Sequence, residues 1–566
     1  MQPLPVDGES IASHAVSAHQ AGDLATALRL YPRAIAAANP APEGLFLNYG
    51  ALLRGEHRVA EAAAVYRRGL ALWPSSLQLL RNYGNLQLQE GLALQALALY
   101  LRAEAVLPSD AKPGKREAIW RQQASALADL GLARRALQLL EPVLAQDPND
   151  VALRLGMAEL SLDLGDRAGA TRLADPVLAG GLPGLEETFQ QCNVLLRLDR
   201  HDLAQERFEQ ATASYRRRAA ELDAKTRQKF DTTCWNFALM LLRRGVMTRG
   251  WELFEHGRRV PNGRGGMQRT VFKLHPARVI PEWDGSSLAG QRLLINGEQG
   301  IGDVLMFTML VPALLQEASA VGLVTYDRLG SLYRRSFPQC QVFDTNDVKR
   351  RAIDPAGWDL QVAIGSLPML RFNHLKAYEG LQPFLKVDPT TKAQFEQRYR
   401  PGGSTPLVGF SWKGGGNAKQ KRTKSLSLVD FLPLFRLPGL RWISLQYGAV
   451  NDELRQFNQE HGLGLLWADD VDPLRDMDRW SALVDSCDLV VSAANTTIHG
   501  AGCQGIPTWV ILGKDPDWRW LGEPGTPCYW YPSVQIVRQQ QLGNWQSPID
   551  ELKQALRSWC EAHGYD

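Results

Sequence analysis

The sequence predicts an α-helical repeat array followed by an α/β region. Three observations lead to this fold class. Glycine, tyrosine and proline positions recur every 34 residues in the first half of the chain. Short apolar runs alternate with helical stretches in the second half. Between an apolar run and a helical stretch lies the glycine turn Gly297-Glu298-Gln299-Gly300-Ile301-Gly302-Asp303.

The composition narrows the class of protein. A chain of 566 residues with 45% hydrophobic residues should hold about two to four domains. The net charge of +3 implies no general attraction to nucleic acid or membranes. The N-terminus lacks the basic and apolar regions of a signal peptide, and no apolar run is long enough for a membrane span. Seven scattered cysteines suggest reduced thiols, so we expect a cytoplasmic protein.

The repeats can be followed along the chain. Pro40, Pro74 and Pro108 are spaced by 34 residues, and Asn48-Tyr49-Gly50 recurs as Asn82-Tyr83-Gly84 at the same interval. This pattern resembles the tetratricopeptide repeat. In that repeat each unit is a helix pair that cannot bury its apolar face alone, so units stack into a superhelix.

About five clear units lie between residues 10 and 181, and two weaker ones near 188–217 and 232–259. We therefore assign residues 1–262 to the repeat array. One longer step between prolines predicts an inserted loop at residues 111–117. The concave surface of such an array could hold a polypeptide; alternatively, the array is a spacer or forms a homo-oligomer.

The α/β region is predicted to form two lobes, residues 263–400 and 401–566, joined by a Pro/Gly-rich linker near residue 400. Strand–helix alternation implies parallel, doubly wound sheets, which bind ligands at the carboxyl ends of their strands. The predicted strands are Arg292–Asn296, Val321–Tyr326, Gln341–Phe343 and Leu360–Ile364 in the first lobe, and Leu407–Trp412, Arg441–Gln446, Leu489–Ala493, Thr508–Leu512 and Val534–Val537 in the second.

The glycine turn carries the first candidate site. Asp303 stands in the first turn of the predicted helix, where an ionised carboxylate is favoured and could act as a general base. Gly300 and Gly302 would let the backbone approach a ligand closely. The alternative is that Asp303 only complements the helix dipole.

A second candidate site follows the strand at residues 407–412. Three glycines lie among five basic side chains, which could cradle a diphosphate. We expect the contacts to come from Ser411, Lys413, Asn417 and Arg422. A flexible, solvated loop would have the same composition.

A third candidate site follows the strand at residues 489–493. Asn495, Thr496 and Thr497 open a helix whose free N–H groups could bind phosphate, although they could also be a simple N-cap. His499 lies inside this helix as a ligand contact or a structural histidine. Gln446 follows another strand and could read a nucleobase edge or a ribose.

Three tryptophans could form a wall for a sugar or base. Trp518 and Trp520 flank Arg519, and Trp412 precedes Lys413. The alternative for the first pair is a core plug in which Arg519 stacks on a ring. No HExxH motif or Cys/His quartet occurs, so we predict no metal site.

Taken together, these segments resemble bacterial glycosyltransferases in which tetratricopeptide repeats are fused to a heptosyltransferase-like domain of family 9. The resemblance covers roughly residues 230–560. The segments that carry it are Gly250-Trp251-Glu252-Leu253-Phe254-Glu255, Trp283-Asp284-Gly285, the glycine turn to Asp303, Ser444-Leu445-Gln446, Asn495-Thr496-Thr497-Ile498-His499 and Pro516-Asp517-Trp518-Arg519-Trp520.

The resemblance implies a GT-B fold of two Rossmann-like lobes and an inverting, metal-independent transfer from a nucleotide-sugar, with no other cofactor. It implies that residues 263–400 form the acceptor side with Asp303 as the base, and that residues 401–566 bind the donor. Heptosyltransferases carry an aspartate where this chain has Ala494 or Asn495, which argues against a heptose donor.

Repeat-fused relatives of this group include flagellin-modifying transferases, so the expected acceptor is a protein held by the repeats. The alternatives are a glycan or lipid-linked acceptor, or an inactive repeat scaffold.

Overall fold

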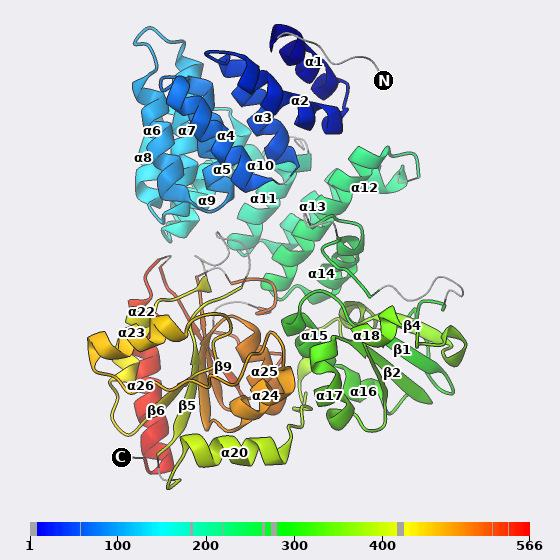
Figure 1. Cartoon of the computed structure of the whole chain (residues 1–566). Helices are drawn as coiled ribbons and strands as arrows, with labels where there is room; N and C mark the ends of the chain where they lie inside the picture. Colours follow the sequence, from blue (N-terminus) through cyan, green and yellow to red (C-terminus); the bar gives the residue numbers. More distant parts are fainter. Residues whose placement is uncertain are drawn as a thin grey trace. The chain divides into compact units, whose positions relative to one another are not determined.

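A computed structural model describes residues 8–56, 58–180, 185–218, 220–262, 266–272, 280–403, 405–415, 424–514, 516–522, 525–541 and 543–565. The chain divides into two compact units. Helices α1 to α10 form the first unit, and the helices from α11 onward form the second together with both β-sheets (Figure 1).

The first unit is a stack of helix pairs. Its helices are α1 (Gly8–Gln20), α2 (Leu24–Ala37), α3 (Glu43–Gly55), α4 (Val59–Leu72), α5 (Leu77–Gln89), α6 (Ala93–Ala105), α7 (Pro113–Asp129), α8 (Ala133–Gln146), α9 (Val151–Asp163) and α10 (Arg167–Leu178). Each odd-numbered helix packs against the next one, and successive pairs are in contact. This is the helical array that the 34-residue period predicts.

Close approach within each pair explains the recurring glycine and tyrosine. A methyl group added at Gly50 would lie 2.4 Å from Cε1 of Tyr66, and one added at Gly84 would lie 2.4 Å from Cε1 of Tyr100. Both tyrosine rings are completely buried. Only glycine lets the first helix of each pair approach the ring on the second this closely.

The predicted loop at residues 111–117 is wrong in its extent. Helix α7 already begins at Pro113 and has 17 residues, whereas α5 has 13. The extra residues therefore lengthen the helix at its N-terminus. Proline at the first helical position supports this start, because its missing N–H would have had no partner there.

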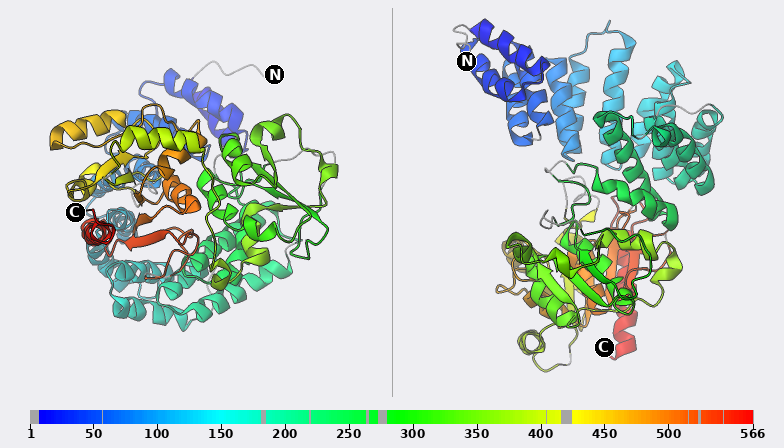
Figure 2. Two further views of the ribbon diagram at one scale, coloured as in Figure 1. Left: turned by 90° about the horizontal axis from the view of Figure 1, so that it is seen from below. Right: turned by 90° about the vertical axis from the view of Figure 1, so that its right-hand side faces the viewer.

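The second unit opens with helices and continues with two separate parallel sheets. The opening helices are α11 (Leu185–Arg197), α12 (His201–Arg217), α13 (Ala224–Arg243), α14 (Met247–Phe254) and the 3₁₀-helix η1 (Glu255–Arg258). The two sheets share no strand and lie side by side within this unit (Figures 1 and 2).

The first sheet has the strand order β3-β2-β1-β4, and every described pair in it is parallel. Its strands are β1 (Arg292–Asn296), β2 (Ala320–Thr325), β3 (Gln341–Asp344) and β4 (Leu360–Ala363). The helical elements that follow these strands are α15 (Ile301–Thr308), α16 (Val311–Leu314), α17 (Asp327–Ser336), α18 (Thr345–Lys349), η2 (Pro355–Gly357), η3 (Ile364–Ser366), α19 (Leu367–Arg371), η4 (Leu375–Tyr378) and α20 (Pro389–Tyr399).

The second sheet has the order β6-β5-β7-β8-β9 and is also parallel. Its strands are β5 (Leu407–Ser411), β6 (Arg441–Ser444), β7 (Leu489–Ala493), β8 (Thr508–Leu512) and β9 (Val534–Arg538). Its helices are α22 (Leu428–Phe435), α23 (Asn451–His461), α24 (Met477–Asp485), α25 (Thr496–Gln504) and α26 (Gln546–His563). The parallel α/β organisation predicted for the second half is thus confirmed.

The packing of the helices near residues 262 and 400 bears on the two predicted domain boundaries. Helices α11 to α14 belong to the same compact unit as the sheets, although the predicted repeat array runs to residue 262. Helix α20 ends at Tyr399, and it packs on α24 of the second sheet, where Lys392 pairs with Asp485 at 2.8 Å. The division into three domains at residues 262 and 400 stays a prediction.

Among the described helices, none combines the length and the apolar character required to cross a lipid bilayer. All seven cysteines are free thiols.

Candidate functional site

The glycine turn places Asp303 at the carboxyl edge of the first sheet. Strand β1 ends at Asn296, and α15 begins at Ile301. Gln299 between them has a left-handed φ of 60°, and its carbonyl accepts a hydrogen bond from the Tyr326 hydroxyl. The Asp303 carboxylate accepts a hydrogen bond from the Gly300 N–H at 3.1 Å, and the residue is only 7% exposed.

Arg519 reaches Asp303 from the second sheet. Its Nε donates to Asp303 Oδ1 at 2.6 Å, and its Nη1 donates to Asp517 Oδ2 at 3.2 Å. The guanidinium also lies 4.6 Å from the ring centre of Trp518. Burial alone would lower the pKa of Arg519, but the two carboxylates outweigh it and hold this pKa above its ordinary value.

Lys424 and Asp517 complete a charged cluster around this pair. Burial lowers the pKa of Lys424, and the negative charges of Asp517 and Asp303 counteract part of that effect. Burial would raise the pKa of Asp517, but Arg519 and Lys424 outweigh it, so this pKa lies below its ordinary value. The cluster therefore contains two cations, Lys424 and Arg519, and two carboxylates, Asp303 and Asp517.

His499 lines the same cluster in its neutral form. Burial lowers its pKa to about 4, and its Nδ1 lies 2.8 Å from the Tyr531 hydroxyl. Its ring stacks on Trp520 with centroids 5.9 Å apart. A methyl group added at Gly302 would lie 2.9 Å from His499 Cδ2, so the starts of α15 and α25 approach each other closely. His499 is thus a buried, uncharged residue that packs beside the charged cluster.

Three predicted site residues tie together the loops at the carboxyl edge of the second sheet. The Gln446 carboxamide oxygen accepts hydrogen bonds from the Ser411 hydroxyl at 2.9 Å and from the backbone N–H of Trp412 and Lys413. Asn495 Nδ2 donates to Ser411 Oγ at 2.6 Å. Because Ser411, Gln446 and Asn495 are all buried, their polar groups position the loops after β5, β6 and β7.

Asn495 also caps α25, since its side-chain oxygen accepts from the Thr497 N–H at 2.8 Å. A pocket of about 80 Å³ opens at this helix start, and Thr496 and Thr497 line it together with Ile301 and Arg328 from the first sheet's lobe. Helix N-termini attract anions through their free N–H groups and the helix dipole. The predicted anion position is therefore next to open space.

A larger pocket of about 330 Å³ adjoins the first one, because Leu445, Pro473, Leu474 and Trp480 line both. Its polar lining residues are Ser444, Gln446, Asn451, Asp469 and Asp472. It lies at the carboxyl end of β6, where open α/β sheets bind ligands. Gln446 was predicted to read a ligand; it lines this pocket while its carboxamide oxygen holds the neighbouring loop.

The basic loop after β5 is only partly described. Asn417 and Arg422 lie outside the described residues. Lys413 is about half exposed and pairs with Glu453 of α23, and its ammonium group lies 5.5 Å from the Trp412 ring centre. Of the lysines of this loop that the structure describes, Lys413 and Lys424, it is Lys424 whose charge interacts with Asp303 and Asp517.

The predicted aromatic wall is wrong for all three tryptophans, because none presents an open ring face. Trp412 is fully buried and stacks on Phe410 with centroids 5.6 Å apart. Trp518 is 4% exposed and packs against Phe254 and Phe307, and Trp520 is 3% exposed. The core-plug alternative, with Arg519 stacked on Trp518, is what the structure contains.

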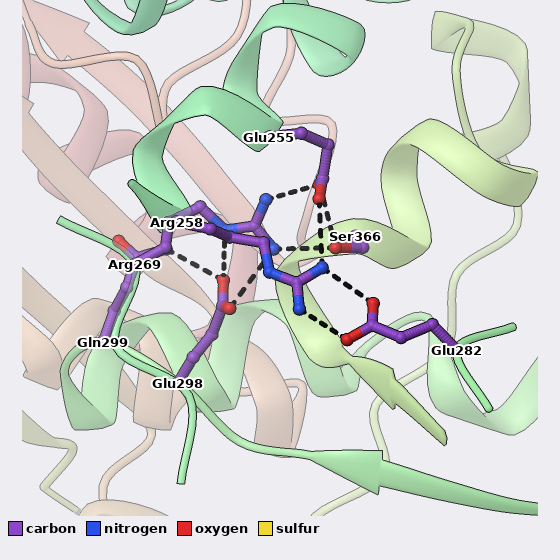
Figure 3. Close-up of polar contacts among 7 residues, drawn as sticks. All are labelled: Glu255, Arg258, Arg269, Glu282, Glu298, Gln299 and Ser366. Atoms are coloured by element: carbon purple, nitrogen blue, oxygen red, sulfur yellow. Dashed lines mark hydrogen bonds and ion pairs between the residues drawn. The ribbon is translucent and has the colours of Figure 1, made fainter. Parts of the chain in front are cut away.

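A buried ion cluster anchors the start of the glycine turn (Figure 3). Arg269 Nε donates to Glu298 Oε1 at 2.8 Å, and its Nη1 binds the Glu255 carboxylate of η1. Its Nη2 donates to Ser366 Oγ at 2.8 Å. The Arg269 and Glu298 side chains are completely inaccessible to solvent. The turn is therefore tied to η1, η3 and the segment around residue 269.

Arg519, Lys424 and Arg269 were not among the predicted site residues. An arginine between two tryptophans shortly after a strand was the only sequence signal for Arg519. Lys424 was one of several lysines in the basic loop. Arg269 had no signal, because nothing in its own segment shows that Glu298 and Glu255 surround it. Within the described ranges, no group of three or more His, Cys, Asp or Glu side chains could hold a metal ion.

Comparison with known proteins supports the repeat assignment. A tetratricopeptide-repeat family model matches residues 127–180. The chain is 27% identical over 452 residues to protein FlbA of Caulobacter vibrioides, covering 77% of this chain and 72% of that protein.

Two solved structures resemble part of the chain. PilF of Pseudomonas aeruginosa is 17% identical and covers 40% of this chain and 96% of its own, with a TM-score of 0.30. MamA of Desulfovibrio magneticus is 14% identical and covers 31% of this chain and 96% of its own, with a TM-score of 0.28.

Proposed function

We propose that the protein is an inverting, metal-independent glycosyltransferase with a GT-B catalytic region that uses a nucleotide-sugar donor. One observation carries this proposal. The Asp303 carboxylate, held by the glycine turn of one sheet, pairs with Arg519 from the lobe of the other sheet, and the charge of Lys424 also interacts with it. A proton acceptor opposite fixed cations is the arrangement that transfer away from a diphosphate needs.

The donor would occupy the carboxyl edge of the second sheet. The pocket of about 330 Å³ falls in the size range of small-molecule sites and would receive the nucleoside. Its acidic and amide side chains, such as Asp469 and Asn451, offer acceptors and donors for hydroxyl groups. The diphosphate would lie at the N-terminus of α25, near Thr496 and Thr497.

The chemistry follows from these positions. As the bond to the sugar breaks, negative charge builds on the departing diphosphate, and Lys424, Arg519 and the α25 N-terminus stabilise it. Asp303 accepts the proton of the acceptor hydroxyl as the new bond forms. The neutral His499 adds no competing positive charge to the cluster.

The acceptor is proposed to be a polypeptide bound by the repeats of the first unit. Tetratricopeptide repeats form extended surfaces that suit a protein ligand. A glycan or a lipid-linked saccharide is the alternative acceptor, in which case the repeats would serve assembly.

A donor screen tests the proposed activity. The 566-residue chain is heated with UDP-, GDP-, ADP- or CMP-sugars, and the donor that binds is then incubated with it, with water as the acceptor. The released nucleotide is measured; it is CMP from a CMP-sugar and a nucleoside diphosphate from the others. A ligand at a hundredfold excess over its Kd should stabilise the fold by about 2.7 kcal/mol. Absence of both a shift and nucleotide release with every donor would favour the inactive scaffold.

A truncation tests the acceptor. A variant that starts at residue 182 keeps the whole second compact unit. Its fold is checked by circular dichroism. We expect it to release nucleotide at the rate of the full chain but to lose transfer to polypeptide. Undiminished transfer to a polypeptide would show that the repeats do not present the acceptor.

A further inference from the structure

The proposed base, Asp303, pairs with an arginine whose donors also suit a diphosphate. Arg519 makes its shortest contact, 2.6 Å, with Asp303 and a longer one, 3.2 Å, with Asp517. An arginine offers five N–H donors in a rigid fork that also matches phosphate oxygens. One of these donors, Nε, already binds the carboxylate of Asp303, the proposed base.

This ion pair is accessible enough to exchange partners. The side chains of Arg519 and Asp517 are 24% and 34% exposed, whereas the side chain of Asp303 is 9% exposed. The pair also lies in a cluster whose two cations balance two carboxylates. A diphosphate brings at least two further negative charges, so Asp303 and the diphosphate would compete for the same cation.

We propose that Arg519 exchanges partners during the reaction: its ion pair with Asp303 opens when the donor enters, and Arg519 then binds the donor's diphosphate. This inference rests on the proposed function. The exchange has one consequence for the base. Asp303 is released to accept a proton only when a leaving group is in place.

Lys424, the other cation of the cluster, provides a comparison with Arg519. Its charge interacts with Asp303 and Asp517 in the same cluster, whereas Arg519 makes the direct ion pair with Asp303. Removing the Asp303 charge should therefore free Arg519 for an anion. If the negative charge of Asp303 acted only by repelling anions, removing it would tighten anion binding whether or not Arg519 is present.

The test uses inorganic pyrophosphate, which needs no knowledge of the nucleobase or sugar. Calorimetric titration of the full-length protein gives its Kd. We expect Asp303→Asn to tighten pyrophosphate binding about five- to tenfold, at the lower end of typical coupling between sites. This gain should vanish in an Arg519→Gln background and persist in a Lys424→Gln background.

Two further variants keep the result interpretable. Arg519→Lys retains the charge, so Asp303→Asn should again tighten binding in that background even if Arg519→Gln does not fold. Asp327→Asn removes an exposed carboxylate from the start of α17, at the same sheet edge, and should leave the Kd unchanged.

The outcomes separate the two proposals. If wild-type protein binds pyrophosphate but Asp303→Asn gives no gain, or a gain that survives Arg519→Gln, partner exchange is wrong while the donor site stands. If neither wild-type nor Asp303→Asn protein binds pyrophosphate or any nucleotide-sugar, the proposed function itself fails.

Discussion

Two arginine–carboxylate clusters flank the same glycine turn, and they differ in their access to water. Arg269 and Glu298, at the start of the turn, have no exposed side-chain surface. Arg519 and Asp303, at its end, are 24% and 9% exposed. In each cluster one guanidinium binds two carboxylates and a second cation lies nearby, Arg258 in the first and Lys424 in the second, so the kinds of groups present do not distinguish them.

The difference in burial indicates a difference in role. A sealed ion pair has lost its hydration, so moving either partner would leave an uncompensated charge. The Arg269 cluster therefore has a structural role: it fixes the glycine turn to η1 and η3. The Arg519 cluster keeps part of its side-chain surface exposed to solvent, and we propose that its cation passes to an incoming anion. One fixed ion pair and one that we propose to be exchangeable suit the proposed base, because Asp303 would have to be held in place and yet released.

The largest effect is expected from the exchangeable cluster. Asp303→Asn should lower the turnover of the bound donor about 10²- to 10⁴-fold, the usual contribution of a general base. The unfolding temperature of this variant should stay close to that of the wild-type protein. Steady-state kinetics with Asp327→Asn as the matched control checks this, and a variant with wild-type turnover would exclude Asp303 as the base.

The sealed cluster should respond in stability. Arg269→Met leaves Glu298, whose side chain has no exposed surface, without its cation, which should cost about 3–5 kcal/mol of unfolding free energy. Arg258 in the same cluster pairs with the half-exposed Glu282, so Arg258→Met should cost about 1 kcal/mol or less. Urea unfolding of both variants measures the contrast. Equal losses would show that burial does not separate the two pairs.

The buried, neutral His499 beside the Arg519 cluster predicts that folding stability depends on pH. The pKa of His499 is about 4 in the fold and about 6.5 when unfolded, so between these values the unfolded chain binds more protons. Stability should therefore fall as pH decreases from about 6.5 to 4, by up to about 3 kcal/mol from this group.

Urea unfolding at pH 7 and pH 5 measures this dependence. In His499→Gln it should weaken, whereas His563→Gln, at an exposed position near the end of α26, should retain it. An unchanged pH dependence in His499→Gln would contradict the buried neutral state.

The smallest effect distinguishes two lysines. Lys424→Ala should weaken pyrophosphate binding about tenfold, because its charge lies in the cluster. Lys413→Ala should change binding by less than about twofold, because Lys413 is half exposed and already pairs with Glu453. The reverse order would restore the sequence-based expectation that Lys413 contacts phosphate.

Much of the fold could be predicted because its signals are local. The runs at residues 292–296 and 489–493 coincide with β1 and β7, since strands buried on both faces of a parallel sheet read as continuous apolar runs. The 34-residue period likewise reports contacts between neighbouring helices, such as Gly50 against Tyr66. These contacts lie within one repeat, so sequence spacing reveals them.

The candidate site could be predicted only in part. Asp303 and the Asn495 cap follow strands, where a ligand edge is expected, and both lie at that edge. The aromatic residues were misjudged, because the sequence does not say whether a tryptophan such as Trp412 faces a ligand or the core. It is fully buried under the second sheet.

The sequence by itself determined the repeat period, the strand positions and the turn that carries Asp303, because each depends on residues close together in the chain. Only the tertiary structure decided which charges meet. Arg519 lies 216 residues from Asp303, and Arg269 lies 29 residues from Glu298. Ion pairs at such separations leave no periodic signal, and burial, which decides whether a pair is fixed or exchangeable, exists only once the chain has folded.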